Sequence, residues 1–131
     1  MATTTATITL SSGDLTGDAL ALSSTATLTK AGNLTGLDQT TGVARKTTEA
    51  TTAYKLADKA DYADAGAHKI YVKNISNIAA EFVTITVEDQ PLGRLYAGDW
   101  AFFPYAGDKE IFATPSESTV MTVEYLVISH R

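Results

Sequence analysis

Apolar and polar residues alternate through most of the second half of the chain. Within residues 82–87, valine and isoleucine alternate with threonine, and Ile70 and Val72 alternate with lysines in the same way. This period of two is typical of a half-buried β-strand, because successive side chains point to opposite faces. Gly, Pro, Asn, Asp and Ser separate six such segments, which we predict as strands: 69–74, 82–87, 92–96, 100–105, 110–114 and 120–129. The pattern predicts an all-β fold, an antiparallel β-sandwich or barrel-like domain.

The last of these strands is apolar on both faces toward its C-terminal end. Residues 121, 123, 125 and 127 form one uncharged face, and the other face becomes apolar at Leu126 and Ile128. Two apolar faces indicate either a central strand of a sandwich or a strand that contributes to a subunit interface. Elsewhere, the sequence Ala-Gly-Asp at 97–99 has the chemistry of a tight hairpin turn, since glycine tolerates a positive φ.

The first half of the chain also has strand character, but its strands carry little apolar surface. Threonines alternate with Ala6, Ile8 and Leu10, and Leu20 and Leu22 occupy even positions after a Gly-Asp break. From residue 33 to residue 52 the alternation disappears, which predicts a long surface loop or an extended arm. Residues 56–64 predict one or two turns of helix before Gly66.

Threonines and aromatic residues divide the chain near residue 66. Residues 1–66 hold 16 of the 21 threonines, and residues 67–131 hold 9 of the 11 aromatic residues. Aromatic side chains bury the largest areas, so we expect residues 67–131 to form the sandwich core. Residues 1–66 are then a Thr-rich N-terminal arm of strands and loops that lies against the core or along a partner.

Composition and charge exclude several classes of protein. The chain has 131 residues and 13.9 kDa, which is the size of one domain. Its net charge of -5, without a basic cluster, argues against a nucleic acid partner. No apolar run has the length of a membrane span, and residues 1–10 do not resemble a secretory signal. Without cysteine there is no disulfide framework, thiolate zinc site or cysteine nucleophile.

Residues that commonly perform catalysis or bind metals occur in no recognisable motif. His68 begins a predicted strand and His130 lies beside the C-terminus, and we expect both to be solvent-facing or edge polar residues. Asp58, Asp61 and Asp64 do not have the spacing of a calcium loop and indicate a solvated turn. We therefore predict no catalytic residue, no cofactor and no metal site, and a protein that is not an enzyme.

Four aromatic residues lie close together in one predicted strand. Alternation places Trp100 and Phe102 on one face of that strand and Phe103 and Tyr105 on the other. One pair is therefore expected in the core. The other pair either forms a stacking platform for a ligand or packs under a loop or a neighbouring subunit.

The order of motifs along the chain resembles a known family. The segments KIYVKN at 69–74, GRLYAGDWAFFP at 93–104 and TVEYLV at 122–127 resemble head decoration, or cement, proteins of tailed bacteriophages, including cyanophages. The segments at 10–16 and 26–32 are similar to the Thr-rich starts of such proteins. The resemblance implies a structural protein of the virion, made in the host cytoplasm, that binds the major capsid protein on the outer capsid surface. It further implies a homotrimer that stabilises the shell by bridging capsid subunits.

Particular residues are candidates for these contacts. Ile8, Leu10, Leu20, Leu22, Arg45 and Lys46 are the candidates for capsid binding. Leu126 and Ile128 are the candidates for the subunit interface. Two other interpretations stay open: a receptor- or glycan-binding module of a phage head or tail fibre, and a small hydrolase that would need His68 joined to carboxylates in a pocket.

Overall fold

The structure is a computed structural model that describes residues 4–13, 20–29, 37, 39–62 and 68–129. These residues form eleven strands: β1 (Thr4–Ser12), β2 (Leu20–Leu28), β3 (Gln39–Thr40), β4 (Ala44–Thr48), β5 (Tyr54–Ala57), β6 (His68–Asn74), β7 (Phe82–Val87), β8 (Gln90–Tyr96), β9 (Trp100–Tyr105), β10 (Ile111–Pro115) and β11 (Met121–Ser129). The part of the chain that the structure describes contains no helix.

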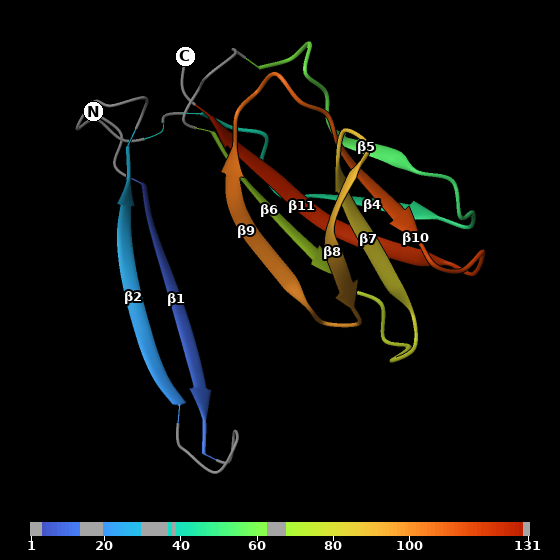
Figure 1. The fold of residues 1–131 in the computed structure, drawn as a ribbon, viewed down its shortest axis with the longest axis horizontal. Helices are drawn as coiled ribbons and strands as arrows, with labels where there is room; N and C mark the ends of the chain where they lie inside the picture. Colours follow the sequence, from blue (N-terminus) through green and yellow to red (C-terminus); the bar gives the residue numbers. More distant parts are fainter. Residues whose placement is uncertain (1–3, 14–19, 30–36, 38, 63–67, 130–131) are drawn as a thin grey trace.

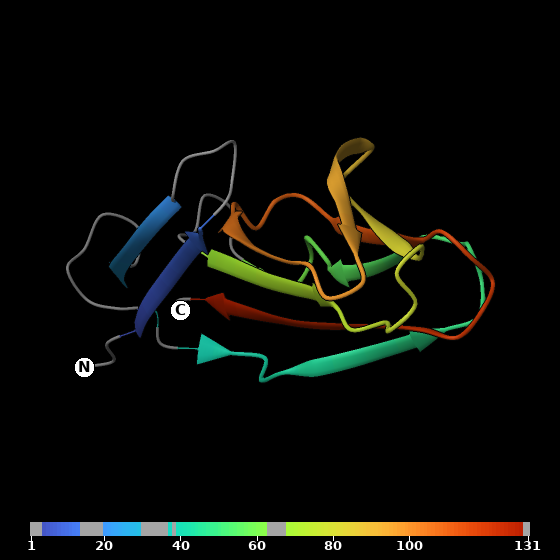
Figure 2. The same ribbon diagram turned by 90° about the horizontal axis from the view of Figure 1, so that it is seen from below.

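Two antiparallel sheets form a sandwich, and a separate hairpin lies beside it (Figure 1). One sheet has the strand order β5-β10-β7-β8. The other has the order β3-β11-β6-β9, with β4 also paired to β11. Strands β1 and β2 pair only with each other among the described residues, and they run at an angle to the strands of the sandwich (Figure 2). The predicted all-β antiparallel sandwich is confirmed.

All six strands predicted in the second half are present, as β6 to β11. Their alternation decides which side chains enter the core: Ile70 and Val72 of β6 are completely buried, whereas Lys69 and Lys73 point to the outer face. Strand β11 lies between β6 and the strands β3 and β4. Strand β11 is therefore a central strand of its sheet, as one interpretation predicted, although its outer face is only half-buried at Leu126 and Ile128.

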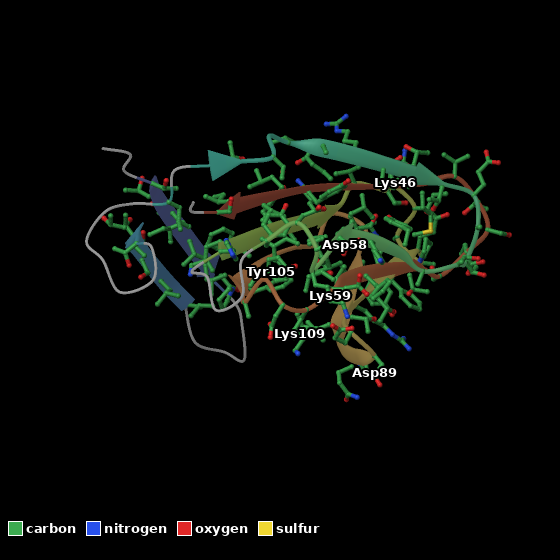
Figure 3. All side chains as sticks on the ribbon, turned by 90° about the horizontal axis from the view of Figure 1, so that it is seen from above. Lys46, Asp58, Lys59, Asp89, Tyr105 and Lys109 are labelled. Carbon is green, nitrogen blue, oxygen red and sulfur yellow. The ribbon has the colours of Figure 1, made fainter. Side chains whose placement is uncertain are left out.

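The core fills the space between the two sheets, where side chains from both layers meet (Figure 3). Its buried members are Leu56, Ala57, Ile70, Val72, Val83, Ile85, Leu95, Tyr105, Ile111, Ala113, Met121, Val123 and Val127. All except Leu56 and Ala57 belong to the second half of the chain, as the distribution of aromatic residues predicted. The first half nevertheless contributes more to the sandwich than expected.

Residues 39–48 form strands rather than the expected loop or arm. Strand β4 pairs with β11 over five residues, and β3 pairs with the end of the same strand. Thr41 joins them, since its N–H donates to the Val127 carbonyl at 3.0 Å and its hydroxyl accepts from the Val127 N–H at 3.1 Å. The segment has almost no apolar alternation because it forms a sheet edge, where β-branched and basic residues are well suited.

The short helix expected at residues 56–64 is also wrong. Leu56 and Ala57 end β5 and are buried, and Ala57 lies opposite Ile111 of β10. The chain then turns at Asp58, which accepts a hydrogen bond from the Ala60 N–H at 3.0 Å. Burial of two apolar side chains outweighs the modest helix propensity of this segment. Residues 63–64 of the expected helix lie outside the described residues.

The turn at residues 97–99 is tight, but it does not form a hairpin. Asp99 N–H donates to the Tyr96 carbonyl at 2.9 Å, and Gly98 has a φ of 87°. The strands on either side nevertheless belong to different sheets, because β8 pairs with β7 and β9 pairs with β6. The turn is therefore a corner that carries the chain from one layer of the sandwich to the other.

We predict that Gly98→Ala destabilises the protein by about 1 kcal/mol, because an L-residue strains at this positive φ. Gly93→Ala is the matched control. A methyl group at either site would meet no atom within 4 Å, but only Gly98 has a positive φ. Urea denaturation measures both variants. Equal stabilities of the two variants would show that the corner does not require glycine.

A buried carboxylate lies beside the loop that precedes β7. Glu81 is 3% exposed and accepts hydrogen bonds from the hydroxyls of Ser76 and Thr119, the latter at 2.5 Å. These hydrogen bonds, with that from Ser76 the stronger, lower the pKa of Glu81 below its usual value of 4.5. The ionised form therefore stabilises the folded chain.

We predict that this contribution to stability is present above about pH 4.5 and is lost as the pH falls through the lowered pKa of Glu81. Glu81→Gln removes the titrating group. Its urea midpoint should therefore change less between pH 6 and pH 3 than that of the wild type. If the urea midpoints of the variant and the wild type change equally between pH 6 and pH 3, other carboxylates cause the acid sensitivity.

Candidate functional site

The β1–β2 hairpin has one apolar face and one hydroxyl-bearing face. Residues directly opposite in an antiparallel pair point to the same side, so the register sorts the side chains. The apolar face consists of Ala6, Ile8, Leu10, Leu20, Leu22, Ala26 and Leu28 together with Thr4, Ser12 and Ser24. The other face is almost entirely threonine and serine, and the hydroxyls of Thr7 and Thr25 lie 2.9 Å apart there.

Four large aliphatic side chains on the apolar face are exposed to solvent. The exposed fractions are 38% for Ile8, 42% for Leu10, 37% for Leu20 and 46% for Leu22. These are the four aliphatic residues that the sequence analysis named as capsid contacts, and the fold gathers them on one surface. A two-stranded hairpin is marginally stable in water, so this surface is suited to pack against a partner.

The apolar face of the hairpin lines a groove together with strand β9. On one side of β9, a cavity of about 630 Å³ lies between hairpin residues such as Ile8 and the side chains of Tyr71, Trp100 and Phe102. On the other side, a cavity of about 610 Å³ is lined by Ile8, Leu10, Leu92, Leu95 and Phe103, among others. Both cavities are lined by residues of β9 and of the hairpin. We call this space the apolar groove, and Figure 1 shows the hairpin on the side of the sandwich where β9 lies.

The four aromatic residues of β9 divide between the core and the groove, as alternation predicted. Tyr105 is 3% exposed, and Phe103 packs against the core. Trp100 is 46% exposed and lies with Phe102 on the outer face, next to Tyr71 of β6. Trp100 and the half-buried Phe102 therefore form one wall of the groove.

Arg45 and Lys46 do not lie with the four aliphatic candidates. Both belong to β4, at the opposite edge of the five-stranded sheet from β9. Arg45 Nη2 pairs with Glu124 Oε2 at 3.1 Å, and the Tyr71 hydroxyl donates to Glu124 Oε1 at 3.1 Å. Lys46 Nζ lies 5.9 Å from the centre of the Tyr54 ring. Their role as capsid contacts stays a prediction, separate from the hairpin.

Leu126 and Ile128 are half-buried on the outer face of β11. Leu126 lies opposite Tyr71, and Ile128 lies opposite Lys69 and Thr40. They extend the apolar surface of the groove wall across the five-stranded sheet. Their role in a subunit interface stays a prediction.

His68 is buried, which corrects the expectation of a solvent-facing residue. It is 1% exposed, and its ring lies 5.4 Å from that of Tyr62 and 6.0 Å from that of Tyr105. Because Lys69 points outward, the alternation of β6 sends His68 inward with Ile70, a signal that was available in the sequence. Burial raises the pKa of Tyr105 to about 12, and its hydroxyl donates to the Lys109 carbonyl at 2.6 Å. His130 lies outside the described residues.

Of the three aspartates in the turn after β5, Asp58 is engaged in local contacts, and the Asp61 N–H donates to the Asp58 carbonyl at 3.0 Å. Asp58 accepts from the Ala60 N–H and pairs with Lys55 Nζ at 3.2 Å, and these contacts lower its pKa. Asp64 lies outside the described residues. Within the described ranges, no group of three or more metal-ligating side chains comes together. No helix of that part is long and apolar enough to cross a membrane.

Sequence inspection missed the groove itself. It assigned the hairpin residues and Trp100 to separate roles, although the absence of charge in residues 100–105 was a visible signal. Comparison of the chain with protein families, curated proteins and solved structures finds no match.

We predict that Tyr105→Ala destabilises the protein by about 3 kcal/mol or more, since it opens a cavity in the core and removes a hydrogen bond. Trp100→Ala, a matched loss of an aromatic ring from the same strand, should cost less than about 1 kcal/mol because that ring is half exposed. Thermal denaturation measures the difference. Comparable losses would place Trp100 in a packed environment and argue against an open groove.

Proposed function

We propose that the protein is a structural, non-enzymatic component of a tailed bacteriophage virion that attaches to the outer surface of the capsid through the apolar groove. The observation that carries this proposal is that four aliphatic side chains on one face of the β1–β2 hairpin, Ile8, Leu10, Leu20 and Leu22, are 37–46% exposed. The resemblance of the sequence to head decoration proteins supplies the class of partner, the major capsid protein.

The energy available from one hairpin favours a protein that works in many copies. Covering the exposed parts of Ile8, Leu10, Leu20 and Leu22 gains about 1 kcal/mol each, about 4 kcal/mol together. Association costs a comparable or larger free energy in lost translational and rotational freedom, so one hairpin alone binds weakly. When one molecule contacts neighbouring capsid subunits, each contact raises the effective concentration of the next. Many bridging copies then stabilise the assembled shell relative to separate subunits.

Self-association is part of the same proposal. Leu126 and Ile128, on the outer face of β11, are the surface that we assign to contacts between copies. A homotrimer would place three hairpins around one axis and so would contact several capsid subunits at once.

A glycan-binding module of a phage head or tail fibre is the second candidate, and the exposure of Trp100 favours it. Stacking on aromatic rings is one way to bind sugars. Sugars also need hydrogen-bonding groups beside the ring, whereas the walls of the groove are mostly aliphatic and aromatic. The groove therefore fits an apolar protein surface better than a glycan.

We predict that the double variant Leu10→Asp with Leu22→Asp no longer binds undecorated shells assembled from the major capsid protein of the same phage. These two residues are directly opposite each other on the apolar face, and charging them prevents their burial. Cosedimentation of the protein with shells measures binding.

The matched control is Thr9→Asp with Ser23→Asp. This is the neighbouring opposite pair, and it lies on the hydroxyl face of the same hairpin. It should bind shells as the wild type does. Equal binding by both double variants would refute attachment through the apolar face.

A further inference from the structure

Strand β9 is an edge strand that carries no charged side chain. Among the described residues it pairs only with β6. The other edge strands of the sandwich with four or more residues carry basic side chains: Arg45 and Lys46 on β4, Lys55 on β5 and Arg94 on β8. The hairpin strands β1 and β2, like β9, carry none. Natural edge strands commonly carry such charges, or bulges, to prevent pairing with other chains. Residues 100–105, WAFFPY, contain no charge, and Pro104 is the one residue among them that restricts pairing.

The position of Pro104 identifies which backbone groups of β9 point outward. Opposite residues of an antiparallel pair alternate between hydrogen-bonded and non-hydrogen-bonded pairs. Pro104 lies opposite Lys69 and has no N–H, so this pair is of the non-hydrogen-bonded kind. Phe102 and Trp100 lie two and four residues before Pro104, so they too form non-hydrogen-bonded pairs with β6. Their N–H and carbonyl groups therefore point away from β6, toward the apolar groove.

The pairing of β6 with β11 gives an independent check of which backbone groups of β9 point outward. Val127 of β11 bonds with Thr41, so its backbone groups point away from β6. Its neighbour Leu126 must then bond with Tyr71 of β6, which lies opposite it. Tyr71 therefore directs its backbone groups toward β11 and not toward Phe102. Both arguments leave the Phe102 N–H on the free edge.

The apolar groove has room for an added strand along this edge. A strand beside β9 would send alternate side chains to the two sides of the sheet. The cavity of about 630 Å³ includes Tyr71 and Lys73 of the outer face, and that of about 610 Å³ includes Leu95 and Phe103. The two share Ile8, Trp100 and Phe102. We propose that β9 accepts an extended segment of the capsid protein as an added strand, which the β1–β2 hairpin covers. This inference rests on the proposed function and specifies how its site binds the partner.

Charge indicates the chemistry of the segment. Lys69 and Lys73 lie on the outer face next to β9, and neither has an ion-pair partner among the described residues. Lys73 also lines the larger cavity. The segment therefore carries apolar side chains toward the cavity that holds Leu95 and an acidic side chain toward Lys73. Strands β1 and β2 contain no acidic residue, so a hairpin from a second copy lacks this complementarity.

The first experiment compares Phe102→Pro with Phe102→Ala on the undecorated shells. Both variants remove the ring, but only proline also removes the outward N–H, and neither removes a hydrogen bond to β6. Circular dichroism confirms that both fold. We expect Phe102→Pro to bind shells at least about tenfold more weakly than Phe102→Ala. Several copies contact one shell, so the loss at each site multiplies in the overall binding. On the wild type bound to shells, amide hydrogen exchange should slow at Trp100 and Phe102.

If the wild type binds shells but the two variants bind equally and exchange at these amides is unchanged, strand addition is refuted and the proposed function stands. If the wild type does not bind shells, the proposed function fails. A second measurement then decides whether the edge of β9 accepts an added strand.

The second measurement titrates the wild type with the capped peptides VDVTVTV and VKVTVTV. Trp100 is the only tryptophan of the chain, so its fluorescence reports directly on the groove. We expect a blue shift with the acidic peptide and at least about tenfold weaker binding of the lysine peptide. Equal or absent responses to both peptides would overturn the proposed chemistry. If Trp100 fluorescence shifts to the blue when the protein alone is concentrated, a second copy of the chain occupies the edge of β9 instead.

Discussion

The corner between the two sheets depends on Asn74, the completely buried last residue of β6. Its side-chain Nδ2 donates to the Leu95 carbonyl at 2.9 Å, and its own N–H donates to the Asp99 carbonyl at 3.0 Å. Gly98 N–H in turn donates to the Asn74 carbonyl at 2.8 Å. A buried amide that lost these partners would cost about 1–3 kcal/mol. The network therefore holds β8 in one sheet and starts β9 in the other.

This corner also gives β9 its position at an open edge. Had residues 92–105 formed a simple hairpin, β8 would have covered one edge of β9. Because Gly98 adopts a positive φ and the chain crosses between layers, β9 instead pairs with β6 alone among the described strands. Trp100 is then exposed, and Phe102 half-buried, on the face that meets the hairpin. The same corner thus joins the two layers around the core and leaves the edge of β9 unpaired beside the groove.

The hairpin and the sandwich differ in where their stability comes from. The sandwich buries aliphatic and aromatic side chains between two layers, whereas the hairpin has a single layer whose apolar face is exposed at Ile8 and Leu22. Burial of apolar surface is the main stabilising contribution in folding, so a single layer gains its stability from what it contacts. An element of this kind is suited to a contact that forms on assembly.

The sequence by itself determined every feature that depends on local alternation. The six strands of the second half, the separation of Trp100 and Phe102 from Phe103 and Tyr105, and the gathering of Ile8 and Leu10 on one face follow from a period of two, because pleating alone sends successive side chains to opposite sides. His68 obeys the same rule, and attention to Lys69 would have predicted its burial.

Only the tertiary structure decided which strands are neighbours. The strand nature of residues 39–48, the sheet change at Gly98 and the open edge of β9 all depend on pairing partners far away in the sequence. Backbone hydrogen bonds between strands are chemically the same for every pair, so alternation predicts a strand without naming its partner. Packing of the two layers against each other determined which strands pair, and this pairing produced the groove.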